Sequence, residues 1–597
     1  MACRATCRPP PTEQDPKRLS LSAFTWAAVL GPGPGSVDQG LADLLAFLAT
    51  SPHSARDLQH GLLAVSTAHH SALLAALPSA LGEPAGPDWP SALPNGFHRL
   101  DLGPRVLTLC VGPVLASVTQ WHGRAQHLWV GGDWPVHLEP LASLARPLAR
   151  QCALGATLAL ALPPDNATHA PWAQAGFVAA RPGHWHYRPR WPVAPRPPEP
   201  TRTAVVIGAG LAGAATCASL TRRGWHVTLL DAAPGPAQGA SGLPVGMLSE
   251  HVTARETVLS RLSRGGMALH TRALQRHVPQ GQGWQTTWVT NLRQGDDADH
   301  EGHSPDAGAP GTLVAPDTQP PPPIPAITVR PAVLVQAWLA QALATGRLQV
   351  RWGGNVARLQ RPSPGEPGLW QALDAQGQVL AQAAHVVVTA AYGTAALLPV
   401  GEVLRPVKGQ LSFATLAGPP LAAHPLRDHG VYVPCFEDSA HPQGTRLWAM
   451  GSTYERGRQD TTVSPENHDR NAASLAATLP AAHALFEQQR ADGELQGWAQ
   501  VRCASLDRLP LVGAVPTPQP LPPHLQLPDV PREPGLWALC ALGSRGLTLS
   551  MLGAELLAAQ MEDEPWPVEK DLALALDPAR FALKHARKNA KNKAKNA

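Results

Sequence analysis

The chain has 597 residues, too many for one hydrophobic core, and its length predicts about three to four domains. Charged residues make up 15% of the chain and the formal net charge is +4, which does not by itself indicate a nucleic-acid-binding protein. The 53 glycines and 64 prolines are many for a globular protein. Because the prolines fall in separate blocks, we expect ordered domains joined by proline-rich connectors.

Residues 22–191 alternate short apolar runs with helical patterns, which predicts a separate α/β domain within residues 1–191. We expect strands at 24–30, 62–65, 106–110, 127–130 and 157–162 and helices at 39–49 and 141–150. The glycine-rich turn after the first strand is of the kind that holds a nucleotide or S-adenosylmethionine. However, Pro32 and Pro34 remove two backbone N–H donors from that turn.

Residues 192–202 form a proline-rich joint, which predicts a domain boundary. The next stretch, 203–231, is the most informative in the chain: a short apolar strand at 204–207, a helix at 211–223 and a second apolar strand at 227–230. Gly208, Gly210 and Gly213 fall in the first strand-to-helix turn. There they allow a tight turn, close approach of the backbone to a pyrophosphate and close packing of helix on strand. Asp231 ends the second strand, where a carboxylate binds the ribose hydroxyls of a dinucleotide.

Beyond this dinucleotide-binding unit, the pattern predicts further α/β structure and an antiparallel sheet that covers the substrate. We expect strands at 327–330, 349–352, 386–389, 405–413, 430–434, 448–454 and 536–542, and helices at 332–344, 471–479 and 547–561. The turn at 543–546 repeats the strand-turn-helix pattern of the first unit. Residues 296–325 are rich in Pro, Gly and Asp and predict a surface loop, so its His300 and His303 are more typical of solvated residues than of metal ligands.

The two ends of the chain and its cysteines bear on location and partners. The N-terminus lacks the apolar segment of a signal peptide, and no apolar run approaches the length of a membrane span. The eight cysteines are scattered, which indicates neither a disulfide framework nor a zinc site. We therefore expect a cytoplasmic protein with no metal and no membrane anchor. The basic tail at 584–597 is more typical of a solvated, frayed end than of an RNA contact.

Several segments between residues 203 and 583 carry a family resemblance. They are VVIGAGLAGAATCASLTRRGWHVTLLD, GASGLPVGML, ITVRPAVLV, KGQLSF, GSTYERGRQDTTVSPENHDRN, VRCASLDRLPLVGAVP and ALGSRGLTLSMLGAELLAAQMEDEPWPV. With them the chain resembles the flavin-dependent amine oxidoreductases of the D-amino-acid oxidase and glycine oxidase superfamily. Within that group it resembles the oxidoreductase half of the bifunctional tRNA wobble-uridine modification enzymes.

The resemblance implies a fold and a function. The fold is α/β: an N-terminal Rossmann-like methyltransferase-type domain, then a FAD-binding Rossmann domain at 203–583 with an antiparallel-sheet substrate subdomain. The implied reaction is FAD-dependent removal of the carboxymethyl group from 5-carboxymethylaminomethyl-(2-thio)uridine in tRNA, with dioxygen as the electron acceptor. In the family, methylation from S-adenosylmethionine by the N-terminal domain follows. Here that domain keeps the family's segments GFHRLDLGPRVLTL, LARPLARQCALGATLALAL and WAQAGFVAARPGHWHYRP in order, but its cofactor turn is degenerate, and Asp133 is only a displaced match to the family's acidic residue.

The same resemblance implies roles for individual residues. Arg502 is expected to bind the substrate carboxylate and Arg545 to share that carboxylate or to support a flavin carbonyl, while Lys408 is a weaker candidate. The implied FAD-binding residues are Gly208, Gly210, Gly213, Asp231, Ser241, Gly242, Gly246, Val356, Gly543, Ser544 and Gly546. Two alternatives stay open: a small-molecule amino-acid or sarcosine-type oxidase, and an N-terminal domain that only binds tRNA or stabilises the chain.

Overall fold

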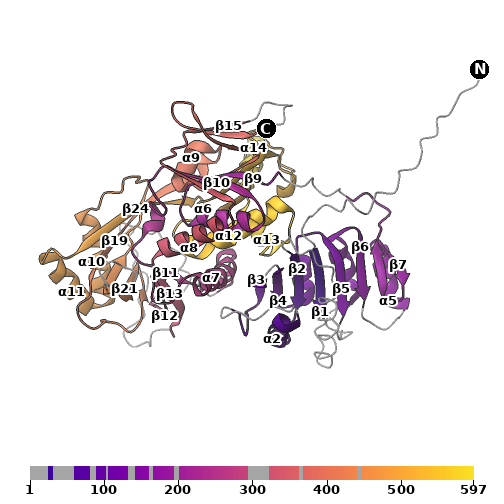
Figure 1. The fold of residues 1–597 in the computed structure, drawn as a ribbon, viewed down its shortest axis with the longest axis horizontal. Helices are drawn as coiled ribbons and strands as arrows, with labels where there is room; N and C mark the ends of the chain where they lie inside the picture. Colours follow the sequence, from indigo (N-terminus) through magenta and orange to yellow (C-terminus); the bar gives the residue numbers. More distant parts are fainter. Residues whose placement is uncertain are drawn as a thin grey trace, which may run out of the picture.

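The computed structural model describes residues 25–30, 59–80, 89–102, 105–131, 141–160, 166–193, 201–253, 255–292, 322–361, 368–439 and 446–596. Figure 1 shows two bodies joined by the segment before β9: an N-terminal sheet with its helices, and a larger C-terminal domain. The expected helix at 39–49, the loop at 296–321 with His300 and His303, most of the linker, and Asp133 lie outside these ranges. None of the helices within the described ranges is long and apolar enough to cross a membrane.

The N-terminal domain is built on one eight-stranded sheet with the order β3-β4-β2-β1-β5-β6-β8-β7. Its strands are β1 (Thr25–Leu30), β2 (Gln59–Val65), β3 (Gly96–Leu102), β4 (Arg105–Val111), β5 (Ala125–Gly131), β6 (Cys152–Leu160), β7 (Phe177–Arg181) and β8 (His184–Tyr187). Its helices include α2 (His70–Ala80), α3 (Val114–Thr119), α4 (Ala145–Ala149) and α5 (Asn166–Gln174). The five central strands are parallel, so the expected strands and the Rossmann-like architecture are confirmed.

The FAD-type core of the C-terminal domain is a six-stranded sheet with the order β14-β10-β9-β18-β26-β25. The strands are β9 (Thr203–Ile207), β10 (His226–Asp231), β14 (Leu348–Trp352), β18 (His385–Val388), β25 (Leu511–Pro516) and β26 (Arg532–Cys540). Its first five strands run parallel, and β18 inserts between β9 and β26, so the chain returns there to the dinucleotide-binding unit. Both faces of β9 are buried, because Val206 packs in one apolar cluster and Val205 in another.

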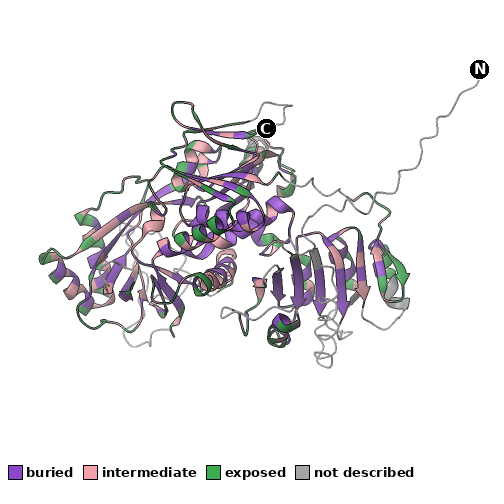
Figure 2. Cartoon of the chain, viewed as in Figure 1, coloured by how far each residue is buried: buried purple, intermediate pink, exposed green. Residues whose placement is uncertain are grey.

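Helices cover one face of this sheet and a small sheet covers the other. The helices are α6 (Leu211–Arg222), α7 (Val258–His277), α8 (Pro331–Ala344) and α12 (Gly546–Glu562), and the small sheet consists of β15 (Arg358–Gln360), β16 (Trp370–Leu373) and β17 (Val379–Ala383). The residues of α6 and α12 are almost all buried (Figure 2). The sequence pattern does not predict α7, whose centre contains Gly265 and Gly266. A Cβ on Gly266 would lie 1.9 Å from the carbonyl oxygen of Thr548, so this glycine allows α7 and α12 to cross closely.

A second, nine-stranded sheet forms the expected antiparallel subdomain. Its strands are β11 (Gly246–Ser249), β12 (Trp284–Asn291), β13 (Ile324–Val329), β19 (Leu404–Thr415), β20 (Leu426–Arg427), β21 (Val431–Glu437), β22 (Arg446–Gly451), β23 (Glu455–Arg456) and β24 (Gln496–Ser505). Helices α10 (Pro465–Thr478) and α11 (Pro480–Ala491) pack on it. Helix α10 begins six residues before the expected start, because the Ser464 side chain caps it by accepting a bond from the N–H of Asn467. Two helices end the chain, α13 (Lys570–Leu576) and α14 (Arg580–Asn596), and α14 continues through the tail that was expected to be frayed.

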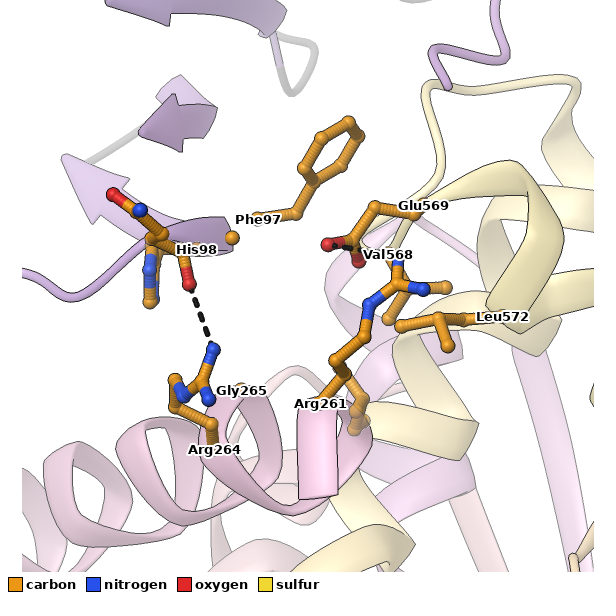
Figure 3. Close-up of a pocket in the computed structure, with 11 residues that line it drawn as sticks. Phe97, His98, Arg261, Arg264, Gly265, Val568, Glu569 and Leu572 are labelled. Carbon is orange, nitrogen blue, oxygen red and sulfur yellow. Dashed lines mark hydrogen bonds and ion pairs between the residues drawn. The ribbon is translucent and has the colours of Figure 1, made fainter. Parts of the chain in front are cut away.

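The two domains meet at β3, the edge strand of the N-terminal sheet. Figure 3 shows Phe97 and His98 of this strand opposite Arg261 and Arg264 of α7. The Arg264 guanidinium donates to the carbonyl oxygen of Asn95 at 3.0 Å, and Arg272 donates to that of Arg99 at 2.6 Å. The edge strand is therefore covered by α7 instead of facing solvent, which protects it from pairing with other chains.

Candidate active site

The turn between β9 and α6 has the geometry that the three glycines predict. Gly208 has a φ of +106°. A Cβ there would lie 2.8 Å from the carbonyl oxygen of Thr389, and one on Gly213 would lie 1.7 Å from the carbonyl oxygen of Gly208. Larger residues at these two positions would push α6 away from the sheet. Gly210 is the N-cap of α6, so the helix N-terminus opens at this turn.

Asp231 and Ser241 hold the same turn from two sides. The Asp231 carboxylate accepts hydrogen bonds from the N–H groups of Ala209 at 2.5 Å and Ala233 at 2.8 Å. The Ser241 hydroxyl accepts one from the N–H of Leu211 at 3.0 Å. Each carboxylate oxygen has a second lone pair that can accept from a ribose hydroxyl. The glycine cradle, the helix N-terminus and this fixed carboxylate therefore fit the pyrophosphate and ribose of FAD.

Val356 lies in the loop after β14. In the sheet β14 is the neighbour of β10, so this loop lies beside the end of β10. The N–H of Gly354 donates to the carbonyl oxygen of Asp231 at 2.8 Å, and the N–H of Gly353 donates to that of Ala233 at 3.1 Å. Val356 packs against the apolar cluster that contains Leu230. The structure thus brings Val356 close to Asp231, where an adenine attached to a ribose on Asp231 would lie.

Gly242 and Gly246 let the segment after the cradle fold back on α12. A Cβ on Gly242 would lie 2.5 Å from the carbonyl oxygen of Ala237, and one on Gly246 would lie 2.6 Å from Cδ1 of Leu547. Strand β11 therefore starts directly against the first turn of α12. This brings the segment with the implied FAD-binding residues Gly242 and Gly246 next to the second glycine-rich turn, 543–546.

The turn at 543–546 lies beside the first one. Gly543 has a φ of +57°, and its N–H donates to the carbonyl oxygen of Cys503 at 2.8 Å. Arg545 is the N-cap of α12, its carbonyl oxygen accepts from the N–H of Leu549 at 2.9 Å, and Ser544 before it is exposed. A Cβ on Gly546 would lie 3.3 Å from Cδ1 of Leu211. The N-termini of α6 and α12 therefore lie together, and both favour negative charge in the space before them.

Arg502 lies on β24, one residue before the Cys503 carbonyl that holds this turn. Its guanidinium donates to the hydroxyl of Ser452 at 3.1 Å and to the carbonyl oxygen of Thr453 at 2.8 Å, and it lies 5.3 Å from the centre of the Tyr454 ring. A Cβ on Gly409 would lie 2.4 Å from the guanidinium, so the glycine of the KGQ segment makes room for it. Sequence reasoning missed Gly409, Ser452 and Tyr454 as supports, although each falls within a segment that carries the family resemblance.

Lys408 does not belong to this site. In the β19–β24 ladder Arg502 is opposite Val407, so Lys408 points to the other face of the sheet. Its side chain is 2% exposed and its ammonium pairs with Asp460 at 2.5 Å. Lys408 is therefore a buried lysine whose ammonium pairs with the partly exposed Asp460, on the face of the sheet opposite to Arg502.

The comparisons with known proteins agree with this geometry. Residues 203–560 match the family described as FAD dependent oxidoreductase. The chain is 36% identical over 630 residues to "tRNA 5-methylaminomethyl-2-thiouridine biosynthesis bifunctional protein MnmC" of Verminephrobacter eiseniae (strain EF01-2), with 93% of each chain covered. It is 38% identical over 547 residues to the protein of the same name from Delftia acidovorans (strain DSM 14801 / SPH-1), covering 81% of this chain and 80% of that one. The chain belongs to the MnmC family. FAD is accordingly the cofactor of its C-terminal domain, and the domain is an oxidoreductase that acts on a CH–NH bond.

The N-terminal domain of this MnmC-family chain, before residue 192, has a second sheet edge at which a ligand could bind. The strand order reverses between β2 and β5 around β1, and ligands of doubly wound sheets bind outside the carboxyl ends at such a point. At the end of β2 the described residues 59–70 include no acid, and His69 and His70 are both buried. The described residues at this strand end therefore provide no carboxylate for a ribose, unlike the end of β10, where Asp231 lies. The turn with Pro32 and Pro34 lies outside the described ranges.

A buried charge network joins the C-terminal ends of α6 and α12 to the N-terminal sheet. Arg223 pairs with Glu555 and with Glu564, each at 2.9 Å, and from the other domain His60 lies 3.0 Å from Glu564 and Arg99 lies 3.5 Å from Glu555. The side chains of all five residues are at most 5% exposed. No sequence pattern indicated this network, because its members are far apart in the chain.

The network fixes the charge states of its members. Burial by itself would raise the pKa of Glu564, but the nearby Arg223 and His60 lower it to about 2. Burial lowers the pKa of His60 and outweighs the opposing effect of Glu564. The carboxylates are therefore ionised and His60 is neutral at pH 7, so the domain interface depends on the full pairing of buried charges.

Proposed function

We propose that the chain modifies the wobble uridine of tRNA by oxidative removal of the carboxymethyl group from 5-carboxymethylaminomethyl-(2-thio)uridine. The observation that carries this proposal is Arg502, a partly buried guanidinium held by Ser452 and Thr453, one residue before the Cys503 carbonyl that anchors the turn leading into α12. Its relatives, at 33–38% identity, are named for the biosynthesis of a 5-methylaminomethyl-2-thiouridine in tRNA.

The substrate group is a secondary amine attached through a CH₂ to a carboxylate. FAD, when bound, supplies a two-electron acceptor. Oxidation of the CH₂–NH bond gives an imine, and water then splits it into the 5-aminomethyl base and glyoxylate. Dioxygen is the proposed final electron acceptor. The amine lone pair assists hydride loss, so the site requires orientation of the substrate more than a strong base.

Arg502 orients the substrate in this scheme. A guanidinium binds a carboxylate through two parallel charge-assisted hydrogen bonds, which fixes the position of the adjacent CH₂. Ser452 and Thr453 hold the guanidinium in place, and Tyr454 lies under it. Arg545, at the start of α12, adds positive charge near the same space, where the helix N-terminus stabilises developing negative charge.

A second candidate function is a small-molecule amino-acid or sarcosine-type oxidase, which would use the same FAD-binding residues. Methylation of the 5-aminomethyl product from S-adenosylmethionine is the family's second step. In this chain we propose that the step is impaired, since the described end of β2 lacks a ribose-binding acid.

Anaerobic single-turnover absorbance tests the oxidation. We expect the flavin to be bleached by tRNA that carries the carboxymethylaminomethyl base and not by glycine or sarcosine, with glyoxylate released in equal amount. Bleaching by free amino acids alone would replace the tRNA assignment with the small-molecule oxidase.

Substitution of Arg502 by methionine tests the carboxylate-binding role. We expect the bleaching rate at subsaturating tRNA to fall by about 10²- to 10³-fold, because truncating a charge-assisted pair costs about 2–5 kcal/mol. The matched control is Arg405→Gln, on the neighbouring strand, where the exposed arginine binds only the carbonyl oxygens of Glu402 and Leu404. If the two variants lose the same activity, Arg502 does not bind the substrate.

A further inference from the structure

Helix α14 carries a net positive charge, whereas the rest of the chain does not. Five of the eight lysines of the chain lie in its last 14 residues. After Asp577 the sequence contains seven lysines and arginines and no acid. Because the whole chain has a net charge of +4, the residues up to Asp577 carry a net charge of −3. A polyanion would therefore find its strongest attraction at this end of the molecule.

The first turns of α14 are fixed to the C-terminal domain. The Arg580 guanidinium pairs with Asp507 at 2.8 Å, and the side chain of Leu583 is 4% exposed. Further along, Arg587 donates to the carbonyl oxygens of Pro523 at 3.3 Å and Leu525 at 3.0 Å. The helix is therefore anchored through its first two turns, not detached from the protein.

Three lysines of the anchored helix lie on one side of it. Lys584, Lys588 and Lys591 are four and three residues apart, so they form a row along one face, and all three are exposed. Within the part of the chain that the structure describes, no carboxylate pairs with any of them. Like charges at this spacing destabilise a helix by about 0.2–0.5 kcal/mol for each pair. A row of phosphates would remove this repulsion.

We propose that the lysine row of α14 (Lys584, Lys588 and Lys591) is a docking surface for the phosphate backbone of tRNA. This inference rests on the proposed function. Lysine ammonium groups act as point charges, so the contact is independent of base sequence and supplies affinity. The site that reads the modified base is separate.

The position of the helix supports this assignment. Arg580 also donates to the carbonyl oxygen of Leu509 at 2.8 Å, in the loop that follows β24. Strand β24 carries Arg502, so the loop that follows the substrate-binding strand contacts the first turn of α14, from which the lysine row continues.

An anionic membrane fits the helix less well. Membrane-surface helices insert large apolar side chains opposite their basic face. In α14 the large apolar residues are Phe581 and Leu583, and both pack on the protein. Beyond Leu583 the other apolar residues with described side chains are Ala586 and Ala590. The helix therefore has charge for a polyanion but no group to insert into acyl chains.

The test is the salt dependence of binding of fluorescein-labelled tRNA to the FAD-loaded full chain. The variant is Lys584→Gln/Lys588→Gln/Lys591→Gln, because glutamine keeps the helix propensity of lysine. We expect the slope of log affinity against log salt concentration to fall by about two to three units. Affinity should fall by about tenfold or more at 50 mM salt and by less at higher salt. Circular dichroism and flavin content should be unchanged.

The control is Arg150→Gln/Arg347→Gln/Arg351→Gln, which removes the same charge from three exposed positions outside α14. If this variant lowers the slope as much as the lysine variant, only net charge matters and the docking surface is refuted. Unchanged affinity for tRNA in the lysine variant also refutes the docking surface. So does binding of the wild-type full chain to phosphatidylserine vesicles in preference to tRNA. Flavin bleaching at saturating tRNA should be equal in all three proteins. A wild type that binds tRNA but is never bleached by it would instead refute the proposed function.

Discussion

The chain contains two doubly wound parallel sheets, and they differ most at the strand ends where a ligand binds. In the C-terminal sheet, the turn after β9 contains Gly208, Gly210 and Gly213, and the next strand ends in Asp231. In the N-terminal sheet, strand β2 next to β1 ends at Val65 and is followed by Ser66 and Thr67 and then by two buried histidines. The strand order places a switch point in both sheets. Topology therefore supplies a place for a ligand, whereas turn residues and a terminal acid decide whether a dinucleotide is bound there.

The largest effect should come from adding one methyl group to the glycine-rich turn between β9 and α6. In Gly213→Ala the new Cβ would lie 1.7 Å from the carbonyl oxygen of Gly208, so α6 must move away from the sheet. We expect purified protein without FAD, measured as the absence of the flavin absorbance band.

Gly239→Ala is the matched control for this loss. Gly239 lies in the same ligand-binding region, has a φ of −95°, and has no atom within 4 Å of the position of a Cβ. It should keep a full complement of flavin. Normal flavin content in Gly213→Ala would show that FAD binding does not require α6 to pack so closely on β9.

The next effect concerns the contact that joins the two sheets. Glu564→Gln removes one of the carboxylates around Arg223, so the network keeps more positive than negative charge in a buried place. We expect the free energy of unfolding to fall by about 3–5 kcal/mol, as for other buried pairs that lose one partner. Thermal unfolding followed by fluorescence measures this change.

The same interface offers an exposed pair for comparison. Asp571 pairs with Arg261 at 2.7 Å, but its side chain is 47% exposed. Asp571→Asn should therefore cost about 1 kcal/mol or less, as expected of a solvated pair. Equal losses in the two variants would mean that burial does not strengthen the dependence on pairing.

The sequence predicts much of this fold and less of the interface. Apolar runs and glycine-rich turns are signals that span only a few residues. The local pattern therefore predicts β9, α6, β10 and the second turn at 543–546. The resemblance predicted Arg502 but not its supports, because Gly409 lies on the neighbouring strand β19 and Thr453 in the loop after β22. Helix α7 escaped prediction because Gly265 and Gly266 lower local propensity, and packing on α12 compensates for them. The charge network joins residues hundreds of positions apart, so no local pattern could indicate it.

A smaller effect follows from the pH dependence of the network. Burial lowers the pKa of His60, so the folded chain resists its protonation while the unfolded chain does not. The lowered pKa of Glu564 acts in the same direction at lower pH. Stability is therefore complete above the unfolded His pKa near 6.5 and falls below it, by at most about 1.4 kcal/mol for each pH unit.

Thermal unfolding between about pH 8 and pH 5 compares the wild type with His60→Gln over this range. Glutamine keeps a hydrogen-bond donor for Glu564 but does not titrate, so the variant should lose less stability on acidification. Parallel curves for the two proteins would assign the pH dependence to other groups.

The smallest expected effect is that of S-adenosylmethionine on the N-terminal sheet. A ligand that binds only the folded state stabilises it by RT ln(1 + [L]/Kd), so a Kd of about 1 mM or weaker gives at most about 0.4 kcal/mol at 1 mM ligand. We expect a shift in unfolding temperature of less than about 2 °C, since strand β2 ends without a carboxylate. Added FAD should shift the unfolding of flavin-depleted protein by several degrees under the same conditions. A comparable shift with S-adenosylmethionine, or methylated nucleoside in the digested tRNA product, would show that a parallel sheet can hold this cofactor without an acid at that strand end. The difference between the two sheets would then lie in the turn residues alone.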